Sequence, residues 1–340
     1  MKRVQSRKKT PWDGETDLTP TQEFLRQYYK MHYEDRHSVV GESGEANMIN
    51  SYAPARCPWC AFETFKKSGY AQGGVQRYRC GSCGKTFLPT TGTIFDDHKI
   101  SISEWMEYCL NLFRHVSVTA DSWNNKNAFT TSRYWLEKLF LTLKTVQNSL
   151  ILRGEVWLDE TFYRVRSEDI ERNTDGKQLR GISNNQICIG VATDKTNTLF
   201  IVEGTGKPSQ KKTFYAFGKH IERGAILHHD KENAHGKLVR ELGLNSVTYA
   251  SADLKGLSDR DNPMNPVNRA HAILKMFLNT HSSFNREAIQ GYLNLFAFVS
   301  NPPFDLLEKV ELIINSAFAN PITLRYRDFY SAISNTSENW

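Results

Sequence analysis

Hydrophobic and polar residues repeat with two different periods along this chain, and the change falls near residue 150. Before it, apolar residues recur at helical spacing in three segments, 101–113, 118–123 and 130–143. Ser103 is the expected N-cap of the first predicted helix, and Thr130 or Thr131 that of the third. Three short helices joined by tight turns are typical of a helix-turn-helix unit, although any small helical bundle gives the same pattern.

From residue 155 the apolar runs become short, which is typical of β-strands. Strands are expected at 155–165, 186–192, 199–203, 225–229 and 247–250, and helices at 210–221 and 234–242. Three strands, a helix and then alternating strand and helix predict a single α/β domain in this half of the chain.

Weaker patterns occupy the two ends. An amphipathic segment at 21–33 follows Pro20 and predicts a short helix. Residues 34–50 are polar with Gly and Ser, which predicts a linker. Residues 305–318 again have the spacing of a helix.

Four cysteines form two close pairs, Cys57-Pro-Trp-Cys60 and Cys80-Gly-Ser-Cys83, with 19 residues between the pairs. This spacing is typical of two knuckles that close on one tetrahedral zinc ion. The intervening glycines and the strand-like run 75–79 predict a hairpin, so the whole segment is expected to be a zinc ribbon. Two disulfides or four unrelated thiols are the alternatives. A site closed by four protein ligands would hold the fold and do no chemistry.

The bulk composition predicts a water-soluble chain with room for two or three domains. It has 340 residues, of which 39% are hydrophobic and 24% charged. No apolar run approaches the roughly 18 residues of a membrane span, and the N-terminus lacks the apolar core of a signal peptide, so we expect a cytoplasmic protein with no membrane partner.

The positive charge is unevenly distributed. The net charge is +6, and residues 1–9 alone hold five Lys or Arg. Further basic residues lie among aromatic ones in the predicted ribbon. That mixture suits contacts with nucleic-acid phosphates, whereas the simpler alternative is a solvated basic surface.

Two aspartates occur in apolar strands, where burying a carboxylate costs free energy. Asp159 interrupts an apolar strand and Asp230 ends another. Buried carboxylates need a partner or a metal ion, and Mg²⁺ prefers hard oxygen ligands. The pair is therefore a candidate two-metal site for phosphoryl transfer, and with the element order it predicts a ribonuclease H-like fold. The alternative is that Asp159 caps a strand end and Asp230 begins a turn.

A third element of this candidate site lies at 266–277. Asn268, His271 and Lys275 are spaced to form one polar stripe of a helix. The Asn268 oxygen can serve a hard cation, and Lys275 can hold a DNA phosphate. Asn268 as an N-cap and Lys275 as a surface lysine are the alternatives. Asp253 is an alternative to Asp230 as the second metal ligand.

Glu160, next to Asp159, is expected to face the opposite side of the strand and to be structural.

These runs resemble one family. The segments Glu155-Val-Trp-Leu-Asp-Glu-Thr-Phe-Tyr163, His229-Asp230, Val267 to Lys275 and Tyr292 to Asn301, downstream of a CxxC…CxxC ribbon, are similar to zinc-ribbon insertion-sequence transposases of the ISXO-like type. The resemblance covers about residues 50–300. It implies Asp159, Asp230 and Asn268 as the magnesium-binding catalytic set, with Lys275 seven residues on. His271 is the second choice for the third position.

The resemblance also implies an organisation and partners. We expect a basic tail, short helix and linker at 1–50, a zinc ribbon at 51–92, a helix-turn-helix-like DNA-binding region at 93–150, a ribonuclease H-like catalytic domain at 151–300 and a helical tail at 301–340. Structural Zn²⁺, catalytic Mg²⁺ or Mn²⁺, element ends and target DNA, self-association and a bacterial, nucleoid-associated location follow from the same likeness. The alternatives are a catalytically silent, domesticated DNA-binding regulator and a metal-dependent repair nuclease.

Overall fold

The computed structural model describes residues 12, 14–27, 42–71, 73–96, 101–124, 127–165, 167–179, 181–230, 233–280 and 286–330. The chain divides into two compact units. We call residues 1–139 with 310–340 the ribbon unit and residues 140–309 the sheet unit.

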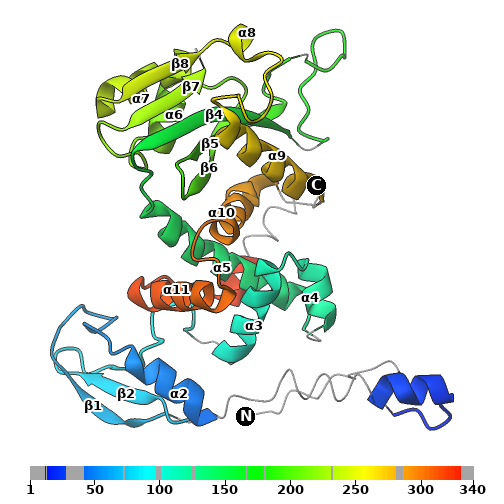
Figure 1. Cartoon of the computed structure of the whole chain (residues 1–340). Helices are drawn as coiled ribbons and strands as arrows, with labels where there is room; N and C mark the ends of the chain where they lie inside the picture. The colour runs from blue at the N-terminus through cyan, green and yellow to red at the C-terminus, as the bar shows by residue number, and fades with distance from the viewer. Residues whose placement is uncertain are drawn as a thin grey trace. The chain divides into compact units, whose positions relative to one another are not determined.

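The ribbon unit contains a small antiparallel sheet of β1 (Phe65–Tyr70), β2 (Gln76–Cys80) and β3 (Thr86–Phe87), in that order (Figure 1). Its core is formed by Phe65, Tyr78 and Phe87, whose ring centroids lie 5.3 to 5.7 Å apart. β2 alternates strictly between buried and exposed residues, so Arg77 and Arg79 share its exposed face.

Three helices follow the ribbon: α3 (Ile102–Phe113), α4 (Val118–Asn124) and α5 (Phe129–Asn148). They meet at Asp121, which is fully buried on α4. Its carboxylate accepts a hydrogen bond from Asn111 of α3 at 2.9 Å and lies 3.5 Å from the Ser132 hydroxyl of α5. A buried acid with these partners fixes the three helices to one another.

The sheet unit is built on five strands in the order β6-β5-β4-β7-β8. They are β4 (Glu155–Arg164), β5 (Gln186–Thr193), β6 (Thr198–Thr205), β7 (Ile226–Asp230) and β8 (Asn245–Tyr249). β4, β5 and β6 are antiparallel neighbours, whereas β7 and β8 run parallel to β4. This mixed sheet confirms the predicted ribonuclease H-like α/β class.

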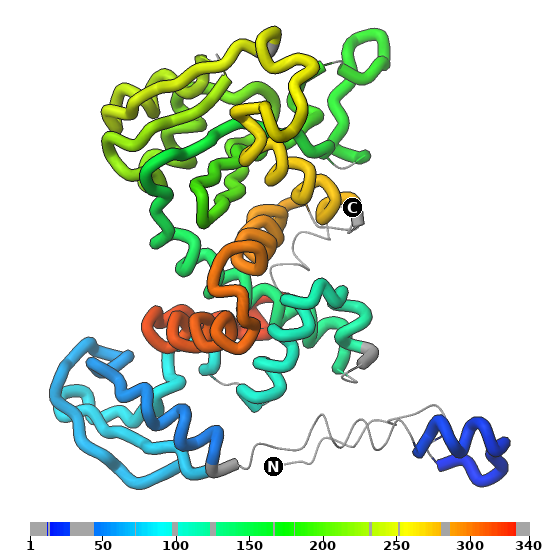
Figure 2. Tube along the Cα trace, in the orientation of Figure 1, coloured from blue at the N-terminus to red at the C-terminus, as the bar shows by residue number. Residues whose placement is uncertain are grey.

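Helices cover both faces of this sheet, and two apolar clusters mark the two interfaces. On one face Trp157 and Ile189 pack with residues of α9 (Asn265–Thr280) and α10 (Ile289–Ser300). On the other face Val156 and Leu158 pack with residues of α6 (Gln210–Phe217) and α7 (Gly236–Leu242). Figure 2 traces this unit from the green of β4 to the orange of α10. Successive β4 residues therefore face different helical layers.

Several details of the sequence interpretation are corrected. Ser101 is the N-cap of α3, since its hydroxyl accepts from the Glu104 N–H, while Ser103 lies inside the helix and donates to Glu45. α5 begins at Phe129, so Thr130 and Thr131 lie in its first turn.

The predicted linker at 34–50 contains α2 (Glu42–Ser51), and the Glu45 carboxylate accepts the N–H groups of Ile102 and Ser103. That tertiary contact supports a helix which its local composition does not favour. Residues 20–27 are helical, and the rest of the segment predicted up to 33 lies outside the described residues. α11 (Leu306–Ala319) accounts for the predicted C-terminal helix.

Candidate active site and cysteine cluster

Asp159 and Asp230 lie side by side on neighbouring parallel strands. The register of β4 and β7 aligns Trp157 with His228 and Leu158 with His229, so the next residue of each strand is the aspartate. Adjacent strands are about 4.8 Å apart, and aligned residues of parallel strands face the same side. The stacked rings of Trp157 and His228, two positions earlier, show this common side directly. The Asp159 carboxylate lies toward the α9 layer, where His271 is 3.8 Å away. The Asp230 carboxylate, at the end of β7, lies 3.9 Å from Nδ1 of His235.

The pair stands in an environment that disfavours two negative charges. Burial raises the pKa of Asp159 to about 7, and the carboxylates of Glu160 and Asp230 contribute to this rise. The Asp159 carboxylate accepts the backbone N–H of Glu160 at 2.9 Å, which opposes the rise without cancelling it. A divalent cation between the two aspartates would supply the missing positive charge.

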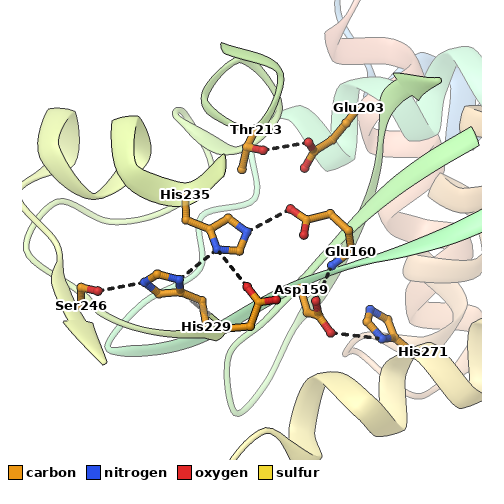
Figure 3. A network of polar contacts seen from close by, with 9 residues as sticks. Asp159, Glu160, Glu203, Thr213, His229, His235, Ser246 and His271 are labelled. Carbon is orange, nitrogen blue, oxygen red and sulfur yellow. Dashed lines mark hydrogen bonds and ion pairs between the residues drawn. The ribbon is translucent and has the colours of Figure 1, made fainter. Parts of the chain in front are cut away.

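His271 is the α9 side chain that lies beside Asp159. It lies 9% exposed in the helix stripe that also carries Val267, Leu274 and Leu278, all buried against the sheet. Its Nδ1 is 3.8 Å from the Asp159 carboxylate, as Figure 3 shows. Burial, with the nearby Lys275 charge, lowers the pKa of His271 to about 4, so the ring is neutral at pH 7.

The second ring nitrogen of His271 is buried and has no hydrogen-bond partner within the described part of the chain. A neutral imidazole beside the Asp159 carboxylate, with one nitrogen unsatisfied, fits a divalent metal site.

Asn268 and Lys275 differ from His271 in their burial. Both are exposed on α9, and α9 already begins at Asn265, so Asn268 lies in the first turn and is not the N-cap. The three residues have the predicted spacing on α9, but only His271 is buried against the sheet. His271 belongs to the buried stripe because it follows Val267 by four residues. Asp253 is exposed on the short helix α8 (Ser251–Leu254).

A second polar cluster lies on the α6–α7 side of the sheet. The Nε2 atom of buried His235 is 2.9 Å from the Glu160 carboxylate, and its Nδ1 is 2.9 Å from Nδ1 of His229. His229 Nε2 is in turn 2.8 Å from the Ser246 hydroxyl. Figure 3 shows these contacts beside a separate bond between Thr213 and Glu203. Glu160 faces away from Asp159 as predicted. The two histidines were missed, although three histidines within the eight residues 228–235 were the available signal.

The four ribbon cysteines converge as their spacing predicted. Their sulfur atoms lie within 4.8 Å of one another. The separations of 3.6 Å between Cys60 and Cys80 and 3.8 Å between Cys57 and Cys83 are far longer than the roughly 2.05 Å of a disulfide.

The backbone around the cysteines fits a metal knuckle as well. The Cys80 sulfur faces the N–H groups of Ser82 and Cys83. The residue after each pair, Ala61 or Gly84, has a left-handed φ of 58° or 68°. Four converging thiols with backbone N–H groups directed at sulfur suit Zn²⁺.

Comparison with known protein families agrees with the geometry of the sheet unit. Residues 151–301 match the ISXO2-like transposase domain family. The resemblance to this family drawn from the sequence is therefore confirmed over these residues. No curated protein matches the sequence.

Three solved structures are similar to this chain, each at low sequence identity and with a low TM-score. A chain of the simian T-cell lymphotropic virus intasome in complex with PP2A regulatory subunit B56 gamma is 10% identical, with 56% of this chain and 67% of that chain covered and a TM-score of 0.29. The catalytic domain of Mos1 mariner transposase is 14% identical, with 54% and 93% covered and a TM-score of 0.22. A pre-cleavage Mos1 transpososome chain is 10% identical, with 90% of each chain covered and a TM-score of 0.20. Similarities this weak carry no argument here.

No helix in the described part of the chain is both long and apolar enough to cross a membrane.

Proposed function

We propose that this chain is a DNA transposase that binds the ends of its insertion sequence and cleaves and joins DNA strands with Mg²⁺ or Mn²⁺. The observation that carries the proposal is the alignment of Asp159 and Asp230 on adjacent parallel strands, with His271 of α9 beside Asp159. The transposase family match over 151–301 gives this geometry its reaction class.

In the proposed reaction Asp159, Asp230 and His271 hold the cations, with His271 rather than exposed Asn268 in the third position. When bound, two such cations stabilise the attacking and leaving oxygens of an in-line displacement at phosphorus. Asp159 must be ionised to serve as a ligand, and a neighbouring cation favours that state. Lys275 is exposed one helical turn beyond His271, where its ammonium group can hold a DNA phosphate.

The ribbon unit is proposed to recognise the element ends. Six basic side chains of the ribbon are exposed: Arg56, Lys66, Lys67, Arg77, Arg79 and Lys85. The Lys85 ammonium lies 5.2 Å from the centre of the Trp59 ring, and that ring is 50% exposed. A cavity of about 1140 Å³ is lined by one of these basic residues, Arg56, together with Trp59 and Arg325. Basic and aromatic side chains around one hollow suit backbone contacts with DNA. Zinc on the four cysteines would hold this surface in shape, and pairing of two ends implies a homo-oligomer.

A strand-transfer assay tests the enzyme directly. The substrate is DNA carrying the inverted repeats that flank the coding sequence, incubated with target DNA and Mg²⁺ or Mn²⁺. We expect Asp159→Asn and Asp230→Asn to abolish cleavage and joining while end binding persists, and Asp253→Asn, an exposed acid of the same unit, to retain activity. Joining that survives either of the first two changes refutes the site. Wild-type binding without cleavage would instead indicate a regulator, and cleavage of any DNA without joining would indicate a nuclease.

A further inference from the structure

Two histidines on the α6–α7 side of the sheet unit direct the same ring atom toward each other. The Nδ1 atoms of His229 and His235 are 2.9 Å apart, and the two rings are nearly perpendicular, at 84°. His229 is 5% exposed and His235 is fully buried. A carboxylate oxygen of Asp230 lies 3.9 Å from the His235 Nδ1. One possible ligand atom from each of the three residues lies within 4.8 Å of the other two.

The opposite nitrogen of each ring is held by an oxygen atom. His235 Nε2 is paired with the Glu160 carboxylate at 2.9 Å, and His229 Nε2 with the Ser246 hydroxyl at 2.8 Å. Metal-binding histidines characteristically donate their second N–H to such an oxygen, which fixes the ring and its tautomer. Both histidines therefore have the outer contacts of metal ligands, and both direct the remaining nitrogen to one point.

The surroundings hold more carboxylates than cations. Glu160 and Glu203 are buried on this side of the sheet, and one oxygen of Glu203 has no hydrogen-bond partner within the described residues. Burial, and the nearby Glu160 charge, disfavour a further negative charge on Glu203. A bound cation would relieve this accumulation of negative charge.

We propose that His229, Asp230 and His235 form a binding site for one divalent transition-metal ion such as Zn²⁺, separate from the cysteine cluster and from the cations held with Asp159. Two imidazoles and one carboxylate select Zn²⁺ or Co²⁺ over Mg²⁺, and a fourth position stays open for water. The metal takes the place of the single proton that otherwise lies between the two Nδ1 atoms, and that proton leaves to solvent.

Asp230 also belongs to the proposed catalytic pair. A metal ion bound in this site therefore occupies a carboxylate that cleavage requires. Micromolar Zn²⁺ is then expected to slow cleavage in Mg²⁺ buffer, a consequence that rests on the proposed function.

Zinc content per chain tests the site itself. The full chain is dialysed against micromolar Zn²⁺ with millimolar Mg²⁺, which fills sites that prefer hard ligands, and bound zinc is measured by mass spectrometry. We expect two zinc ions per wild-type chain and one after His235→Gln or His229→Gln. His228→Gln is the matched control, since His228 is the neighbour of His229 on β7 but stacks on Trp157 on the other face, and it should keep two. Wild-type protein with one zinc ion, or His variants with two, would overturn the proposal.

Cobalt provides a measurement that needs no variant. Adding Co²⁺ to the wild-type chain with its cysteine cluster already filled with zinc should produce visible d–d absorption without sulfur-to-cobalt charge-transfer bands. Absence of that absorption overturns the site even if a histidine variant fails to fold. Ser246→Ala should weaken Co²⁺ binding roughly 10-fold, as loss of an outer contact does.

Asp159→Asn separates the two proposals. It should remove cleavage and yet retain the second metal ion, so a failure of the transposase assignment and a failure of this site give different results.

Discussion

Asp159→Asn should make the metal-free protein more stable at neutral pH while it removes activity. The asparagine can keep the hydrogen bond that the carboxylate accepts from the Glu160 N–H, at 2.9 Å in the wild type. What it removes is a negative charge that burial and the carboxylates of Glu160 and Asp230 disfavour. The Asp159 carboxylate thus destabilises the metal-free fold and is suited to binding a cation.

The size of this effect follows from the pKa of Asp159, which is raised from 3.8 to about 7 in the folded chain. Between these two values the folded state binds more protons than the unfolded state, so stability falls as pH rises. At about 1.4 kcal/mol per pH unit, the wild type loses up to roughly 3 kcal/mol between pH 5 and pH 7. The side chain is 29% exposed, and screening by solvent reduces this to about 2 kcal/mol.

Hydrogen exchange of peptides from β4 measures this free energy for the sheet unit separately from the ribbon unit. The buffer holds no divalent cation other than ribbon-bound zinc. Between pH 5 and pH 8, the free energy of unfolding of Asp159→Asn should rise by about 2 kcal/mol relative to that of the wild type. Asp253→Asn is the control and should show no gain, since Asp253 is exposed. Added Mn²⁺ should stabilise the wild type and not Asp159→Asn. The electrostatic reasoning would be refuted if Asp159→Asn were no more stable than the wild type at pH 8. A gain in its unfolding free energy that did not depend on pH would refute it as well.

Three further tests address the site and the two units. His271→Ala should lower strand cleavage at least about 10-fold and Asn268→Ala much less, with Mn²⁺ more effective than Mg²⁺ in the wild type because imidazole suits the softer ion; equal losses in cleavage assays would contradict the placement of His271. Ala61→Gly should stabilise the ribbon by about 0.5–1 kcal/mol, and Gly84→Ala should cost about 1–2 kcal/mol, because both positions have left-handed φ; thermal melts that show no opposite shifts would rule this out. Gly291→Ala places a methyl group against the Phe140 ring and should cost about 1–3 kcal/mol in urea unfolding, partly restored by Phe140→Leu; a cost unaffected by the second change would exclude the clash.

Local spacing was sufficient for some of the site. The two C-x-x-C pairs predict one cluster because each knuckle needs only its own four residues and the hairpin between them returns the chain. Asp159 and Asp230 were recognisable because an acid in or after an apolar strand is costly wherever the strand lies. The order of strands and helices then limited the domain to few arrangements.

Other parts depended on contacts that no local pattern records. Asn268 and His271 both lie on α9, and the sequence interpretation placed Asn268 first and His271 second for the third position. Packing places His271 near Asp159, since Val267, Leu274 and Leu278 of the same helix are buried against the sheet. In the same way, α2 follows from the contact of Glu45 with the start of α3.

From the sequence alone came the α/β class, the cysteine cluster, the paired aspartates and the family to which residues 151–301 are matched. Tertiary structure alone decided which α9 residue lies beside Asp159 and that Glu160 meets His235, 75 residues later in the chain. The physical reason is that periodicity defines which residues share a face of one element, whereas the identity of the opposing face is fixed only when elements distant in sequence bury their apolar surfaces together.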